Sequence, residues 1–329
     1  MKSSNVFVAA ALGAALVSGC KKETASAPRA VASGALSPAE TDLLKHLPAG
    51  SQALFGGNMF KMQKWLAESP LAKLSQQVQE PKMAAYNACI ATTVDSMQVV
   101  GSMSFGSTGM TMRMYIKGAS IANLSKCATD AQLAFDASPD GNYVAITTES
   151  MHVKSTAPFI AVDGGIYGGN SVASLAANSV TAAPREVLES EVAGLAQASA
   201  LNDTNPQAMI TKLDRRANFW VAGNAANTPV AGKVGDFFVT FRMTDGLTID
   251  GTVQLKDAAD SSKLLKGVGD MKSHLDEIPA NMSAFKDVVR GVTANKTNDG
   301  IRITLTVTNP QLEAITTQLG PMMARFMPR

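Results

Sequence analysis

The chain has little aromatic character, little charge and few histidines. Of its 329 residues, 5% are aromatic and 17% are charged, and the net charge is +2 at pH 7. A nucleic-acid surface needs basic stripes and stacking rings, so the composition excludes nucleic acid as an expected partner. The balanced charge also implies no strongly acidic or basic partner.

Catalytic and metal-binding motifs are missing as well. The Gly-x-Ser-x-Gly motif is absent, and the histidines, His46, His152 and His274, lie in no cluster with metal-ligand spacing. Ser283 and Lys286 have Ser-x-x-Lys spacing, but the other elements that penicillin-binding enzymes need are not in place. We therefore predict that the protein is not an enzyme and has no catalytic residue, metal site or cofactor.

A glycine-rich segment, Gly164-Gly165-Ile166-Tyr167-Gly168-Gly169-Asn170, lacks the features of a nucleotide loop. It has neither the Gly-Lys-Ser/Thr end of a phosphate loop nor the Rossmann spacing. The same Gly-Gly-Asn triplet follows Phe55. We interpret both triplets as strand-to-helix turns, with Asn58 and Asn170 as helix caps.

Long apolar runs are absent except at the start of the chain. There, Lys2 precedes a run from Val6 to Val17 that is too short to span a bilayer and closes on Val17-Ser18-Gly19-Cys20. This end resembles the lipobox of bacterial lipoproteins, in which signal peptidase II cuts before the cysteine and the thiol carries diacylglycerol. The resemblance implies a signal peptide over residues 1–19 and a lipid on Cys20. The alternative is an ordinary cleaved signal followed by a cysteine.

Residues 20–40 contain mainly Ala, Ser, Gly, Pro and charged residues, with almost nothing to bury. They are typical of a flexible tether between a lipid anchor and a folded body. Lys21, in place of Asp, follows Cys20. By the sorting rule of enteric bacteria, this residue predicts attachment to the periplasmic side of the outer membrane.

With Cys20 assigned to the lipid, Cys89 and Cys127 remain as an even pair. In an oxidising compartment such a pair is expected to form a disulfide. The alternative is two buried free thiols, because small cysteines pack well in cores.

The chain contains a weak internal repeat. Residues 47–58 align without gaps to residues 213–224, and each segment is a short apolar strand that ends in Gly-Asn. Residues 108–112 align in the same way to residues 245–249, and both segments lead from a turn into an alternating strand. The repeat predicts two halves built on one αβ module.

Period-two alternation of apolar and polar residues predicts strands over 110–117, 247–256 and 301–308. Such alternation is typical of antiparallel sheets with one solvent-facing side. Helices are expected from Asp257 to Leu275, from Asn309 onward, and from Pro184 to Leu201. The fold class is therefore α+β, with two related modules, each an antiparallel sheet covered by helices.

This layout resembles that of two-repeat lipoproteins of deltaproteobacteria, with Cys89 and Cys127 flanking the first hairpin as a bonded pair would. The resemblance carries no activity. The expected parts are a signal peptide (1–19), a tether (20–40), a first αβ module (41–170), linking helices (171–211) and a second αβ module (212–329).

Methionine is the one abundant unusual residue, with 17 in the chain. Met110, Met112 and Met114 alternate along one predicted strand, opposite Arg113 and Tyr115. Thioethers at this spacing could bind copper(I), but the repeat places Leu247 and Ile249 at equivalent positions. We therefore predict that these methionines pack into the core, with Arg113 and Tyr115 on the wet face.

Together these features predict a non-catalytic, lipid-anchored envelope protein that acts as a binding or assembly module. Its partners would be the membrane, through the lipid on Cys20, and an envelope protein or amphiphile that the sequence does not identify. The alternative is a periplasmic carrier of lipids or other amphiphiles, which would require a connected apolar cavity.

Overall fold

The computed structural model describes residues 38–72, 80–94, 96–106, 109–150, 153–174, 179–202, 208, 210–211, 213, 217–225, 234–277 and 282–326. The predicted signal peptide, Cys20 and nearly all of the predicted tether lie outside the described residues, as does His152. Among the helices of the described part, none combines the length and the apolar character needed to cross a membrane. Antiparallel strands with covering helices make the fold α+β, which confirms the predicted class.

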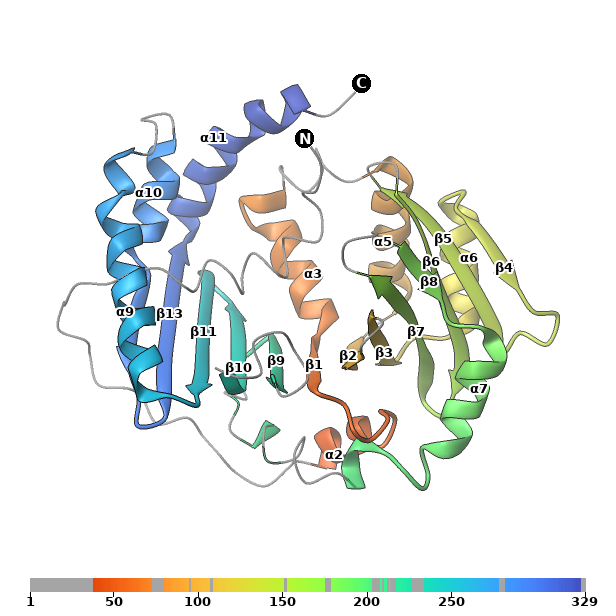
Figure 1. Cartoon of the computed structure of the whole chain (residues 1–329). Coiled ribbons are helices and arrows are strands. Elements are labelled where there is room, and N and C mark those ends of the chain that lie inside the picture. Colours follow the sequence, from red (N-terminus) through yellow and green to blue (C-terminus); the bar gives the residue numbers. More distant parts are fainter. Residues whose placement is uncertain are drawn as a thin grey trace.

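The strands of the described residues form one sheet of 13 strands, in which neighbouring strands are antiparallel. The first half contributes β1 (Ala53–Asn58), β2 (Gln98–Gly106), β3 (Gly109–Lys117), β4 (Ala134–Ala137), β5 (Tyr143–Ser150), β6 (Val153–Val162), β7 (Gly165–Ser174) and β8 (Ser179–Ala182). The second half contributes β9 (Phe219–Asn224), β10 (Val234–Met243), β11 (Gly246–Leu255), β12 (Thr293–Lys296) and β13 (Gly300–Thr308). Their order is β12-β13-β11-β10-β9-β1-β2-β3-β7-β6-β5-β4, with β8 paired to β7 beside this path (Figure 1).

Strands β1 and β9 join the two halves around a local two-fold axis. They pair antiparallel, and Phe55 lies opposite Val221, the residue that aligns with it in the sequence repeat. The hairpins β2–β3 and β10–β11 are counterparts too, since Gly109 and Gly246 occupy equivalent positions and have φ angles of 149° and 148°. The repeated segments therefore lie at equivalent places on the two sides of this axis.

The two halves differ by one hairpin. In the second half β13 pairs directly with β11, and β12 lies outside it. In the first half β7 and β6 lie between β3 and the short hairpin β5–β4. The hairpin β6–β7 is thus an addition to the first half. The segment 171–211, which was expected to hold linking helices, also contains the end of β7 and all of β8.

Some of the helices begin at residues whose side chains cap them. The Asn58 side chain accepts a hydrogen bond from the Lys61 amide at 2.9 Å, which confirms the predicted cap, and Ser120 accepts one from the Asn123 amide at 3.2 Å. The helix predicted from Pro184 ends earlier than Leu201, at Gly194. The described helices are α2 (Pro38–Leu44), α3 (Met59–Glu68), α5 (Pro81–Thr93), α6 (Ile121–Asp130), α7 (Arg185–Gly194), α9 (Ala258–Ser273), α10 (Ser283–Arg290) and α11 (Asn309–Phe326), with short 3₁₀ turns η2 (Ala200–Asn202) and η3 (Leu275–Glu277).

Three apolar clusters hold these layers together. The largest lies on one face of the central strands, where residues of α2, α7 and η2 pack on β1, β2, β3, β7 and β9. The other two lie on the opposite face, one beneath α5 and α6, the other beneath α10 and α11. Figure 1 shows these two helical groups toward opposite ends of the sheet, with α3 between them. The middle of that face lies between two separate cores.

Candidate functional site

The central strands carry large apolar residues on both faces. On the face that α2 and α7 cover, Leu54, Tyr115 and Ala222 are at most 1% exposed. Ala53 and Val99 are buried on the opposite side, but most of the large side chains there are only partly buried and belong to none of the three clusters. The strand register places the following residues of β1, β2, β3, β9 and β10 together on this side, which we call the apolar face: Phe55, Met103, Phe105, Met110, Met112, Met114, Phe219, Val221, Phe237, Val239 and Phe241.

Aromatic rings lie flat on this face because glycines lie beneath them. A Cβ atom on Gly101 would come within 2.0 Å of the Phe55 ring, and one on Gly223 within 2.6 Å of the Phe237 ring. The Phe55 and Phe219 ring centroids are 6.2 Å apart, which is within the usual range for an aromatic pair. The glycines therefore leave room for the rings to lie against the backbone.

An antiparallel sheet usually turns polar residues toward water when its other face is buried. Here the second face presents phenylalanine, valine and methionine instead. Contiguous apolar patches that remain partly exposed mark interaction surfaces in folded proteins. The apolar face is therefore the candidate functional site.

The methionines of β3 do not lie where the alternation predicted. Arg113 and Tyr115, expected on the wet face, are 5% and 1% exposed, whereas Met110, Met112 and Met114 are partly exposed. The prediction of core methionines is wrong because α7 covers the Arg113 side of the sheet, while the three methionines lie outside the two clusters on their own side.

The buried Arg113 side chain forms an ion pair with Glu191 of α7. Its Nε and Nη2 atoms donate to the two carboxylate oxygens of Glu191 at 2.6 and 2.8 Å, and the Tyr167 hydroxyl donates to Glu191 at 3.0 Å. Burial acts to lower the pKa of Arg113, but the hydrogen bonds and charge of Glu191 outweigh it and raise that pKa. Burial raises the pKa of Tyr167, so its hydroxyl remains a donor. The cluster fastens α7 to β3 and β7.

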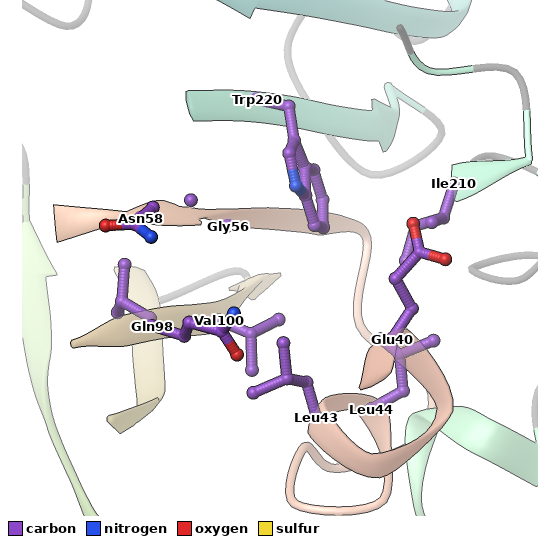
Figure 2. A pocket seen from close by; sticks show the side chains of 11 residues that line it. Glu40, Leu43, Leu44, Gly56, Asn58, Gln98, Val100, Ile210 and Trp220 are labelled. Carbon is purple, nitrogen blue, oxygen red and sulfur yellow. The ribbon is translucent and has the colours of Figure 1, made fainter. Parts of the chain in front are cut away.

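A small cavity lies on the covered side of the sheet, between α2 and the strands β1, β2 and β9 (Figure 2). Its volume is about 140 Å³, and its lining includes Glu40, Leu43 and Trp220. The Trp220 ring lies over Gly56, where a Cβ atom would come within 2.5 Å of it. Pockets for small molecules usually have volumes of about 300 to 1,000 Å³. This cavity is too small for such a ligand.

A wider depression, of about 400 Å³, is lined by Lys45, His46, Asp163 and residues of α7 and η2. The His46 ring stacks on Tyr115, with ring centroids 3.9 Å apart, and the Tyr115 hydroxyl donates to the Asp163 carbonyl at 3.0 Å. Burial, with a smaller effect of Lys45, lowers the pKa of His46, and burial raises the pKa of Tyr115 to about 12. Because His46 packs on a ring and not on a hydroxyl or thiol, this depression forms no nucleophile and base pair.

The other sequence candidates lie apart from one another. His274 is exposed, and a hydrogen bond of 2.7 Å with Glu277 raises its pKa. Ser283 begins α10, and its hydroxyl accepts a hydrogen bond from Gln318 at 2.9 Å. Among the described residues, no group of three or more His, Cys, Asp or Glu side chains could hold a metal ion.

The glycine-rich segment 164–170 forms the turn between β6 and β7 and the first part of β7. The prediction of Asn170 as a helix cap is wrong, because Asn170 lies inside β7, opposite Met112. At Gly169 a Cβ atom would come within 2.1 Å of the Met112 carbonyl oxygen. This glycine therefore serves the close approach of two strands.

Cys89 of α5 and Cys127 of α6 form the predicted disulfide, with their Cα atoms 5.5 Å apart. Cys127 is fully buried in the cluster beneath these helices, and Cys89 packs against it. The bond therefore fastens α5 to α6 at one end of the sheet.

No family model matches the chain, and no curated protein matches it. Solved structures of TP0453 align with it in three crystal forms. Form I is 11% identical over 84% of this chain and 97% of that chain, with a TM-score of 0.40. Form III is 10% identical over 84% and 98%, with a TM-score of 0.45, and form IV is 9% identical over 85% and 98%, with a TM-score of 0.41. Likeness at this level assigns neither family nor function to the chain.

Proposed function

We propose that this chain is a non-catalytic, lipid-anchored envelope protein that binds a partner through its apolar face. The observation that carries the binding role is the partly exposed row of phenylalanines and methionines on β1, β2, β3, β9 and β10. The lipobox that ends at Cys20 and the residues that follow it support the anchor. The periplasmic side of the outer membrane is the compartment that we propose.

The start of the described chain supports an arrangement in which the face is free to meet a partner. Helix α2 begins at Pro38 and packs on the sheet side opposite the apolar face. The residues from Cys20 to Pro38 would reach roughly 25 Å as a flexible chain. The anchor would thus leave from the covered side, and the tether would be long enough to hold the apolar face clear of the bilayer.

A carrier of lipids or other amphiphiles is the second candidate, since an apolar face also suits hydrocarbon. It has weaker support, because the cavity of about 140 Å³ is too small for such a ligand and the depression of about 400 Å³ has charged residues on its wall.

Replacing Cys20 with serine is expected to release the protein from the membrane without changing its fold. The substituted residue lies outside the described body, and the lipid is the only anchor that we propose. Detergent-phase partition measures attachment, and mass spectrometry measures the acyl chains. A Cys20→Ser protein that still enters the detergent phase without acyl mass would contradict the anchor.

The binding role is tested by a photo-crosslinking residue at Phe105 of the anchored protein, in the cells that make it. We expect an adduct that forms on illumination, because Phe105 lies on the apolar face. The matched control places the same residue at Phe285, which is 44% exposed on α10 and is not one of the residues of the apolar face. If position 105 gives no more adduct than position 285, the apolar face is not a binding surface. A lipid adduct would favour the carrier.

A further inference from the structure

Helix α3 belongs to the first half of the chain and covers part of the second half, on the same side of the sheet as the apolar face. It begins at the end of β1 and contains no fully buried residue. Trp65 packs in the cluster with Leu247 and Leu305, and its Nε1 donates to the Thr244 carbonyl, in the turn between β10 and β11, at 3.1 Å. A short amphipathic helix from β1 therefore crosses the local axis and covers residues of the second half.

The local two-fold relates that covered surface to a second one on β2 and β3. The repeat aligns Met110 with Leu247 and Met112 with Ile249. The strand register pairs Met103 with Met112 and Phe105 with Met110. These four residues, which we call the methionine strip, are Met103, Phe105, Met110 and Met112. All four are partly exposed and lie in no core cluster.

The connection that corresponds in the second half to residues 59–97 is too short to hold a helix like α3. Residues 59–97, which include α3 and α5, connect β1 to β2. Between β9 and β10 the connection is only residues 225–233. This connection is shorter than the ten residues of α3 alone, so it cannot supply a helix of that length with a return to β10. In the described part of the chain, no helix therefore occupies the position that the local two-fold relates to α3.

We propose that the methionine strip binds an amphipathic helix of a partner protein, in the position that the local two-fold relates to α3. This inference rests on the proposed binding role of the apolar face. The strip lies inside the sheet, where β1 and β7 already pair with β2 and β3, so an extended peptide would find no free strand edge. A helix satisfies its own backbone and needs only an apolar surface, for which flexible methionines are well suited.

The placement of the anchor leaves the strip accessible to a protein. The chain enters the body on the opposite side of the sheet, through α2, so the tether would attach away from the strip. The packing of Trp65 with Leu247 and Leu305 also shows that this side accepts a helix that presents an aromatic residue to aliphatic side chains.

The probe is a synthetic peptide with the sequence of residues 58–69, locked as a helix by a lactam between Lys64 and Glu68. These two side chains are exposed in α3, at 64% and 67%, and lie 3.9 Å apart, so the bridge leaves the apolar side unchanged. The full mature chain carries Cys20→Ser and ¹³C-methyl methionine. We expect saturable shifts of the Met103, Met110 and Met112 methyl signals on titration, and none from a peptide with Trp65→Glu.

Met112→Lys should weaken binding of the peptide at least about tenfold, because it places a charge in the contact. Met110→Gln provides a milder second variant if the first does not fold, and near-ultraviolet circular dichroism checks each fold. Phe285→Lys, on exposed α10, is the matched control and should leave the affinity within about twofold.

Three results would overturn the helix proposal. The strip signals could shift with phosphatidylethanolamine and phosphatidylglycerol vesicles but not with the peptide, which would identify hydrocarbon as the occupant. They could shift with protein concentration alone, which would identify a second copy. Peptide binding could also persist in Met112→Lys, which would place it elsewhere. The first two results would leave the apolar face as a binding surface, whereas failure of the proposed function would show as no adduct at Phe105.

Discussion

The Glu191→Ala protein is expected to lose about 3 to 5 kcal/mol of its free energy of unfolding, because the substitution leaves a buried arginine without its partner. The Arg113 side chain is 6% exposed and donates two hydrogen bonds to Glu191, at 2.6 and 2.8 Å. Tyr167 would lose its acceptor in the same step. Denaturant unfolding of the variant and the parent protein measures the difference.

Glu189→Ala is the matched control, since it removes the same side chain from the same helix. Glu189 is 50% exposed and pairs with Arg185, which is 34% exposed, so its loss should cost less than about 1 kcal/mol. Equal losses for the two variants would mean that the Arg113 pair contributes no more than a surface pair. Arg113→Met, which removes the buried charge itself, should restore part of the loss in the Glu191→Ala background.

Removal of the disulfide is expected to cost about 2 to 5 kcal/mol. The bond between Cys89 and Cys127 closes a loop with a sequence separation of 38 and joins α5 to α6 above a shared cluster. The double variant Cys89→Ser with Cys127→Ser should unfold at a lower denaturant concentration than its parent. Because the chain has only three cysteines, a Cys20→Ser parent leaves this bond as the sole variable.

Thiol labelling provides the second readout. Unreduced, denatured parent protein should take up no alkylating label, and a single Cys89→Ser substitution should make Cys127 reactive. If both cysteines in unreduced material were alkylated, the bond would not exist in the cell. If the bond existed but the stability did not change, the helices would be held by their cluster alone.

The sequence predicted the local features of the fold. Alternation in residues 301–308 marked β13, Asn58 marked the start of α3, and an even pair of cysteines marked the disulfide. Each of these depends on neighbours in sequence or on the compartment. The pairing of β1 with β9 and the insertion of β6–β7 were not predicted, because strand order depends on contacts far apart in the chain.

The candidate site was missed because the alternation rule assigns polar residues to the solvent side. It placed Arg113 in water and the β3 methionines in the core, and the structure reverses both. One signal was present in the sequence. Residues 219–221 and 237–239 are apolar at successive positions, which is typical of strands with two apolar faces. Only the structure shows which of the two faces the helices cover.

The central position of β1 also bears on how the chain folds. β1 ends at Asn58, yet one of its two neighbours, β9, begins only at Phe219. Until β9 pairs with β1, one edge of β1 has no hydrogen-bonded neighbour. An open strand edge beside phenylalanine and methionine side chains is prone to aggregation. Sheets built on such distant pairing fold slowly. A chain whose second half is incomplete would therefore expose this edge until β9 has paired with β1.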